Sequence, residues 1–236
     1  MRAIMLALLL FSPSLLAAEV VHIAVAANFK TTVERINALF TTQSGYRTTL
    51  SSASTGVLFS QIQHGAPFDI FFAADKTSPQ KLEENDYGIP GQRYCYARGV
   101  LVLMGSNNPG EALANPRLSL AIANPNTAPY GKAAMEVLQR PEFTAATTAR
   151  KLVRANNAIQ AYQHWYSSTV DMALVPTSLT SGQGAAINPN WYTAIEQHVI
   201  ALRHGEQNPA AQAYIRWIRS EEVQELIKNA GYGTCP

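Results

Sequence analysis

The sequence predicts an α/β protein of two lobes, each a mostly parallel sheet flanked by helices, with a ligand cleft between the lobes. Apolar, β-branched runs of strand length alternate with segments whose apolar residues recur every three or four positions. This alternation restarts after residue 98. A chain of 236 residues with 47% hydrophobic side chains is long enough for two lobes. Strands separated by helices imply right-handed crossovers and parallel pairing.

The first 18 residues have the pattern of a secretory signal. Arg2 gives a positive start, an apolar run covers 3–11, and small residues precede Glu19. The run is much shorter than the roughly 20 residues of a membrane helix. We predict that residues 1–18 are a signal peptide cleaved before Glu19, so that the mature protein is exported. A membrane anchor is the alternative.

The charge balance of the chain limits its partners. It has 18 basic and 16 acidic residues, a net charge of +2, and only 14% charged side chains. Removal of Arg2 with the signal leaves 17 basic against 16 acidic residues, or +1. No basic patch favours nucleic acid as a partner. Neutral dipoles therefore have to meet any charged ligand.

The first lobe is predicted over residues 19–97. It opens with a strand over 20–27, which an amphipathic helix from Phe29 to Phe40 follows, and that helix stops near Gly45. The same half contains a strand over 47–52, a short helix around Leu58 and Ile62, and a strand over 68–73.

The second lobe is predicted over residues 98–197, and residues 198–236 are predicted to return to the first lobe. The second lobe contains strands over 100–104, 118–123, 151–153 and 170–175, a helix over 133–138 and a helix around Ile159, Tyr162 and Tyr166. The return segment contains a strand over 199–202 and helices around Trp217 and Leu226. We expect the chain to cross between lobes near 96–100 and 196–199.

The two cysteines are Cys95 and Cys235, the second of them one residue from the C-terminus. Export to an oxidising compartment permits a disulfide that ties the tail to a strand in the middle of the chain. Two free thiols are the alternative. A structural zinc site is disfavoured because it needs four ligands at close spacing, and the five histidines are scattered along the chain. No metal ligand is therefore predicted.

Small polar residues follow several predicted strands. They occupy the four junctions at 26–28, 51–56, 128–131 and 155–158. In open α/β sheets, ligands bind beyond the carboxyl ends of strands, where helix N-termini present unpaired N–H groups. Asn, Ser and Thr are also ordinary N-cap residues, so each junction alone is compatible with a structural role. Together the four predict a site for an anion held by neutral donors.

Distinctive motifs occur in order along the mature chain. They are Ala26-Ala27-Asn28-Phe29, Ser-Thr-Gly-Val-Leu at 54–58, Gln-Ile-x-x-Gly-Ala-Pro-Phe-Asp at 61–69, Ala-Pro-Tyr-Gly-Lys at 128–132 and Asn-Ala-Gly-Tyr-Gly at 229–233. They resemble the periplasmic molybdate-binding proteins, which deliver an oxyanion to an ABC importer. This resemblance implies the type II periplasmic-binding-protein fold, no catalysis and no cofactor. It also implies a monomer that passes its ligand to a membrane permease.

The resemblance assigns ligand-binding residues position by position. Asn28 corresponds to the first of them and Thr55 to the second, with Ser54 beside it as a further contributor. Tyr130 and Ala158 fall where the family uses backbone N–H groups at helix starts.

One position departs from the pattern. Some members of the family have a further tyrosine after the strand that here ends at Val175, whereas this chain has Pro176. That contact has to be replaced or omitted.

The expected ligands are molybdate and tungstate, which are fully deprotonated at neutral pH and accept hydrogen bonds only. None of the four junctions contains an acidic residue. Sulfate is the alternative oxyanion. An alternative of another class is an exported α/β enzyme for a small anionic substrate, with Asp69 or Asp75 as general base. For both carboxylates the structural reading is turn and N-cap hydrogen bonding.

Overall fold

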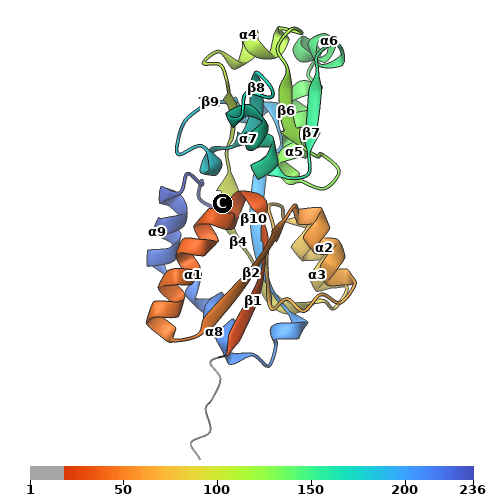
Figure 1. The fold of residues 1–236 in the computed structure, drawn as a ribbon. Helices are drawn as coiled ribbons and strands as arrows, with labels where there is room; N and C mark the ends of the chain where they lie inside the picture. Colours follow the sequence, from red (N-terminus) through yellow and green to blue (C-terminus); the bar gives the residue numbers. More distant parts are fainter. Residues whose placement is uncertain (1–18) are drawn as a thin grey trace, which may run out of the picture.

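The computed structural model describes residues 19–236 and contains two five-stranded sheets, one above the other in Figure 1. The predicted signal peptide, residues 1–18, lies outside the described residues. Within residues 19–236, no helix combines the length and the apolar character needed to cross a membrane.

The first sheet is built around β1. Its strands lie in the order β2 (Arg47–Ala53), β1 (Val20–Ala26), β3 (Ile70–Phe72), β10 (Ile195–Leu202) and β4 (Gly88–Gly99). The first three strands are parallel, and β10 is antiparallel to both β3 and β4. We call this sheet with its helices the first lobe.

The second sheet is built around β6. Its strands lie in the order β7 (Leu152–Ala155), β6 (Leu120–Ala123), β8 (Met172–Pro176), β5 (Leu101–Met104) and β9 (Ala185–Ala186). Strands β7, β6 and β8 are parallel, and β5 is antiparallel to β8. We call this sheet with its helices the second lobe. The predicted α/β fold is thus confirmed, and both sheets are mixed because each contains an antiparallel strand.

Helices cover both faces of the first sheet. The helices of this lobe are α1 (Lys30–Ser44), α2 (Thr55–Gln63), α3 (Thr77–Glu84), α8 (Pro209–Trp217) and α9 (Glu221–Asn229). The buried face of α1 packs with α8 and α9 on one side, and α2 and α3 pack on the other. The C-terminal helices therefore return to the first lobe, as Figure 1 shows in blue.

Helices also cover both faces of the second sheet. The helices of this lobe are α4 (Pro109–Ala114), α5 (Pro129–Leu138), α6 (Pro141–Ala149) and α7 (Ala158–Tyr166). Helices α4, α5 and α6 share one apolar cluster with the sheet, and α7 packs on the opposite face. Short 3-10 turns complete the chain: η1 (Ala27–Phe29), η2 (Thr177–Leu179), η3 (Pro189–Trp191) and η4 (Arg203–Gly205).

A strand was expected at Cys95, but the full length of β4 was not predicted. It contains Pro90 and Gly91, which normally punctuate strands. The strand tolerates both because it lies at the edge of the sheet, paired only with β10, and an edge strand does not need every N–H for pairing. Helix α6 was also missed because its Thr-rich sequence has little apolar periodicity.

Two strands carry the chain past the junction of the lobes. Strand β4 ends where the second sheet begins, and β10 brings the chain back to the first sheet. The proposed lobe limits at 97/98 and 197/198 remain a prediction. Cys95 and Cys235 form a disulfide with a Cα–Cα distance of 6.0 Å. It anchors the C-terminal tail on β4 beside the crossing.

Candidate functional site

A small cavity lies between the lobes, at the carboxyl ends of the parallel strands. Its volume is about 10 Å³, close to the space that the centre of one water molecule requires. It is lined by Ala26, Ala27, Asn28, Ser54, Thr55, Ala74, Ala128, Pro129, Tyr130, Asn157 and Ala158. All five residues predicted from the sequence are among them. None of these described lining residues carries a charge.

Three helices begin at this cavity. Helix α2 starts after Ser54, α5 after Ala128 and α7 after Asn157. The first N–H groups of a helix have no intrahelical acceptor, and the helix dipole places partial positive charge there. Among residues 19–236, no protein acceptor is found for the amides of Tyr130 and Ala158. Both are free to donate to an anion.

Two side-chain hydroxyls from the first lobe face the same space. The Thr55 hydroxyl accepts the Ala74 N–H at 3.0 Å, which leaves its own proton available. Ser54 is only 4% exposed, and its Oγ has no hydrogen-bond partner in the described structure. A buried hydroxyl without a partner is costly unless a ligand satisfies it. Ser54 therefore presents a hydroxyl at the cavity that no described protein group satisfies.

Asn28 lines the cavity, but its side chain is already engaged. Its Nδ2 donates to Gln197 Oε1 at 2.7 Å and to Tyr232 Oη at 3.3 Å. These two bonds use both amide hydrogens. The side-chain donor expected at Asn28 thus points into the protein in this structure, and the Asn28 backbone carbonyl accepts from Tyr232 and Ser178.

Sequence reasoning missed Gln197, the polar residue behind the cavity. Gln197 is fully buried on β10. Its Oε1 also accepts from Tyr96 Oη at 3.0 Å, and its Nε2 donates to Tyr130 Oη at 3.2 Å. Burial raises the pKa of the Tyr96 and Tyr130 hydroxyls well above their ordinary value, so both stay protonated. The only sequence signal for Gln197 was a polar run at the start of an otherwise apolar strand.

The C-terminal tail contributes Tyr232 to the back of the site. Its hydroxyl donates to the Asn28 carbonyl at 2.7 Å, across 204 residues of sequence. The tail is held there by the disulfide of Cys235 and by pairing of Gly233 with Arg98. Tyr232 was recognised in the sequence only as part of a motif.

The chain matches a known protein family and several characterised relatives. The family model of the bacterial extracellular solute-binding proteins matches residues 21–233. The chain belongs to that family. It is 39% identical to the molybdate-binding protein ModA of Azotobacter vinelandii over 230 residues, which cover 92% of this chain and 90% of that protein. It is 34% identical to ModA of Rhodobacter capsulatus over 227 residues, with the same coverage.

Solved structures of other binding proteins share the fold. The periplasmic molybdate-binding protein of Azotobacter vinelandii superposes with a TM-score of 0.85 at 30% identity, covering 92% of this chain and all of that one. The sulfate-binding protein SubI of Mycobacterium tuberculosis superposes with a TM-score of 0.75 at 12% identity, covering 91% of this chain and 86% of that one. The second likeness concerns the fold alone.

Membership of a solute-binding family means that the chain is not an enzyme, as predicted. The two carboxylates considered as general bases have structural partners instead. Asp69 accepts hydrogen bonds from the His22 amide and from Asn208, and it pairs with His204. Asp75 accepts from the Ser78 N–H and hydroxyl at the start of α3. No cluster of three or more metal-binding side chains occurs in residues 19–236.

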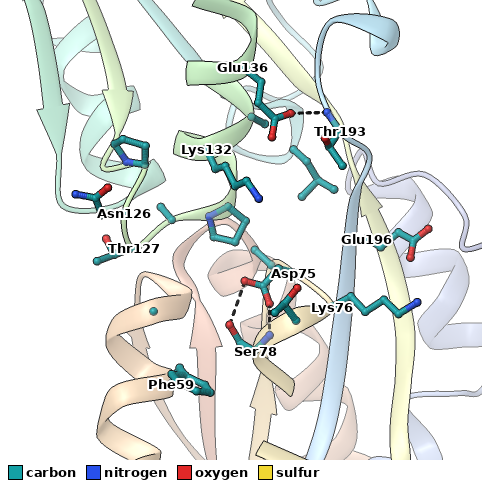
Figure 2. A pocket seen from close by; sticks show the side chains of 18 of the residues that line it. Phe59, Asp75, Lys76, Ser78, Asn126, Thr127, Lys132, Glu136, Thr193 and Glu196 are labelled. Atoms are coloured by element: carbon teal, nitrogen blue, oxygen red, sulfur yellow. Dashed lines mark hydrogen bonds between the residues drawn. The ribbon is translucent and has the colours of Figure 1, made fainter. Parts of the chain in front are cut away.

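A wider groove opens beside the small cavity, with a volume of about 650 Å³. Figure 2 shows Lys132 on α5 above Asp75, and both residues line this groove. Burial raises the pKa of the Asp75 carboxyl, while bonds from Ser78 and the charges of Lys132 and Lys81 oppose that rise. The groove contains carboxylates as well as lysines, whereas none of the described residues that line the small cavity is charged.

The two lobes touch at the boundary between cavity and groove. The Gly56 N–H of α2 donates to the Thr127 carbonyl of the second lobe at 2.8 Å. A Cβ at position 56 would lie 3.1 Å from the Thr127 Cα. Glycine permits this close backbone approach, which separates the small cavity from the groove.

Proposed function

We propose that this solute-binding protein captures molybdate and tungstate and delivers them to the membrane permease of an ABC importer. The observation that carries the proposal is the uncharged cavity where three helix N-termini and two hydroxyls converge. Molybdate and tungstate only accept hydrogen bonds, so a site made of neutral donors suits them. The relatives described as molybdate-binding proteins support the same ligand.

Hydrogen bonds of this kind supply enough free energy for tight binding. A bare dianion in a closed cleft needs partners for its oxygens because its desolvation costs tens of kcal/mol. Each hydrogen bond to a charged group contributes about 1.5–3 kcal/mol, so five contribute about 8–15 kcal/mol. Nanomolar affinity corresponds to about 12 kcal/mol. Helix dipoles add about 0.3–1 kcal/mol each. Lysine and arginine are not required.

Size is the proposed basis of selection among dianions. Molybdate and tungstate have longer metal–oxygen bonds than the sulfur–oxygen bonds of sulfate. A cage fitted to the longer bonds leaves donors unpaired around sulfate, at about 1–3 kcal/mol for each buried donor. Sulfate is therefore expected to bind more weakly by orders of magnitude.

Ligand uptake requires the lobes to move. The cavity of about 10 Å³ has room for one water-sized group, and a tetrahedral oxyanion is larger. We propose that the lobes part at the Gly56–Thr127 contact and close on the anion. Ligand that bridges both lobes stabilises the closed form by its differential affinity, and the permease recognises that form.

Titration calorimetry across molybdate, tungstate, sulfate, phosphate and chromate tests the ligand. Molybdate and tungstate are expected to bind with nanomolar affinity. Comparable affinity for sulfate would end the molybdate proposal and leave a general oxyanion site. Absence of binding to all five anions would end the oxyanion proposal as a whole.

Two variants test the assigned hydroxyls. Ser54→Ala and Thr55→Val are each expected to weaken molybdate binding about 5- to 150-fold. Ser54→Ala should leave the melting temperature of the free protein unchanged or higher, because that hydroxyl has no protein partner. Thr180→Val is the matched control: Thr180 is a buried threonine whose hydroxyl bonds only loop carbonyls. Wild-type affinity in both site variants would remove these residues from the ligand set.

We also propose that the mature protein is a periplasmic monomer released by cleavage after residue 18. Mass spectrometry of the exported protein should then find Glu19 at its N-terminus. Light scattering should give the mass of one chain, with and without molybdate. A retained N-terminal segment would support the membrane-anchor alternative.

A further inference from the structure

Gln197 connects the two lobes behind the oxyanion cavity. We propose that it is a positioning residue, and that anion binding reverses the hydrogen-bond chain Asn28–Gln197–Tyr130. This inference rests on the proposed oxyanion site and deepens it. Asn28 belongs to the first lobe and Tyr130 to α5 of the second, whereas Gln197 lies on the strand β10 that the chain follows between them. The orientation of the Gln197 side-chain amide is thereby linked to both lobes.

The chain in the structure runs from Asn28 toward Tyr130. Asn28 Nδ2 donates to Gln197 Oε1, and Gln197 Nε2 donates to Tyr130 Oη. In this direction both hydrogens of the Asn28 amide are used, because Tyr232 takes the second. An oxyanion accepts hydrogen bonds only, so this orientation offers it no side-chain N–H from Asn28. The Tyr130 hydroxyl proton also has no acceptor among the described residues.

The opposite direction satisfies the same heavy atoms. Asparagine and glutamine amides exchange N and O positions by a half-turn with almost no change of shape. After both amides turn, Gln197 Nε2 donates to Asn28 Oδ1, and Tyr130 Oη donates to Gln197 Oε1. Asn28 Nδ2 is then free to donate to the anion.

Tyr96 makes the reversal possible without an unpaired buried group. In the present direction its hydroxyl has two acceptors in reach, Gln197 Oε1 at 3.0 Å and the Ala73 carbonyl at 3.3 Å. In the reversed direction the hydroxyl donates to Ala73 and accepts the second Gln197 N–H. The reversal gives up only the bond from Asn28 to Tyr232, which at 3.3 Å is longer than the bonds that Gln197 makes.

Packing holds Gln197 where both directions remain available. A Cβ at Gly99 of the neighbouring strand β4 would lie 2.2 Å from Tyr130 Oη and 3.1 Å from Gln197 Nε2. The absence of that carbon lets the tyrosine reach the glutamine. Because the amide is fully buried, water does not compete for its hydrogen bonds. An anion that turns Asn28 therefore also fixes α5 through Tyr130.

A double-mutant cycle tests whether Gln197 acts through Asn28. Gln197→Met keeps the length of the side chain and removes its donors and acceptors. Its expected cost in molybdate affinity is about 10- to 150-fold in the wild-type background and less than about threefold in an Asn28→Ala background. Equal cost in both backgrounds overturns the inference, because a purely structural role does not depend on Asn28.

A second variant keeps the test decisive if Gln197→Met does not fold. Gln197→Glu retains the acceptors for Asn28 and Tyr96 but has no N–H to donate to Asn28. The effect of its charge is present in both backgrounds, so the cycle still isolates the coupling to Asn28. Wild-type affinity in Gln197→Glu overturns the inference. If the wild-type protein binds none of the oxyanions, the proposed function fails instead.

Tyr130→Phe probes the other end of the chain. Its loss of the terminal donor should weaken molybdate binding about 3- to 10-fold. Tyr214→Phe is the matched control, since Tyr214 is another fully buried tyrosine that donates to an amide oxygen, that of Asn37, on the far side of the first lobe. It should keep wild-type affinity. An unchanged affinity in Tyr130→Phe contradicts the reversed direction.

Discussion

The two lobes present different kinds of donor to the same cavity. The first lobe contributes the hydroxyls of Ser54 and Thr55 together with the start of α2. The second contributes the backbone amides of Tyr130 and Ala158, at the starts of α5 and α7. Side-chain substitution therefore removes donors from the first lobe, whereas the second lobe keeps its donors under almost any substitution.

The two lobes also differ in the side chains that pack behind the cavity. Directly behind Asn28, the ring of Phe29 packs against Phe72, Tyr96 and Tyr232, with ring centroids 4.6–5.4 Å apart. The helix α5 of the second lobe is instead buried mostly through alanine, valine and leucine side chains, with Tyr130 as its one buried aromatic residue. Several aromatic rings with polar tips give the first lobe hydrogen bonds to the back of the site. The second lobe contributes one such ring, Tyr130, and otherwise relies on the placement of its helices.

The largest expected effect comes from removing a backbone donor of the second lobe. Ala158→Pro deletes the first N–H of α7 and places a ring carbon in the cavity, at a position where proline is compatible with a helix. Asn157 has φ −154° and ψ 177°, which suits the residue before a proline. Molybdate affinity should fall by about 1,000-fold or more in calorimetry, from the lost bond and the overpacking.

Glu221→Pro is the control for this variant. Residue 221 is likewise the first of its helix, α9, and Ser220 before it is extended with φ −63° and ψ 150°. Residue 221 does not line the cavity. The molybdate affinity of Glu221→Pro should therefore match that of the wild type. Tight binding by Ala158→Pro would mean that the second lobe holds the anion by other groups.

Acid is expected to have an intermediate effect, a loss of unfolding free energy that originates at His198 in the first lobe. Burial and the nearby charges of Arg93 and Lys76 lower the pKa of His198 to about 4. The unfolded chain takes up this proton below about pH 6.5, and the folded chain does not. The unfolding free energy should therefore fall by up to about 3 kcal/mol as the pH drops from about 6.5 to about 4.

Chemical denaturation of the wild type and of His198→Gln at neutral and acid pH measures this contribution. The variant should lose most of the pH dependence, while His64→Gln, at an exposed histidine, should keep it. The buried cation of the second lobe, Arg150, remains charged throughout this range. If the unfolding free energy of His198→Gln depended on pH as in the wild type, the acid sensitivity would belong to another group.

The smallest expected effect concerns the contact between the lobes. Gly56→Ala adds a carbon 3.1 Å from the Thr127 Cα and should weaken molybdate binding about fivefold. The free protein should become slightly more stable, because alanine favours helices by about 1 kcal/mol over glycine. Gly110→Ala is matched, since Gly110 is also the second residue of a helix and has only one atom nearby, 3.8 Å away. Gly110→Ala should leave the affinity for molybdate unchanged.

Local patterns predicted the parts of the fold that depend on local physics. The strand from Val20, the helix with Val33 and Ile36, and the junctions at Thr55 and Ala158 all follow from periodicity and from polar residues after strands. The full length of strand β4 was not predicted, because Pro90 and Gly91 are acceptable in a strand only at the edge of a sheet. Long-range pairing with β10 creates that edge.

The back of the site depends on distant partners, so no local pattern contains it. Gln197 meets Asn28 across 169 residues and Tyr130 across 67, and Tyr232 meets Asn28 across 204. Sequence reasoning placed Asn28 at the cavity and expected its side chain to donate there. In the structure the orientation of the Asn28 side chain is set by Gln197 and Tyr232, which no local pattern connects to it.

The disulfide gives the chain a topology that the sheets alone do not. Cys95 and Cys235 are 140 residues apart, and the ring that they close contains every strand of the second sheet together with β10. A protease that cuts once within the second lobe therefore leaves a single covalent molecule, which separates into two fragments only after reduction. The disulfide keeps the tail that bears Tyr232 on β4, so a nicked protein retains Tyr232 behind the cavity until it is reduced.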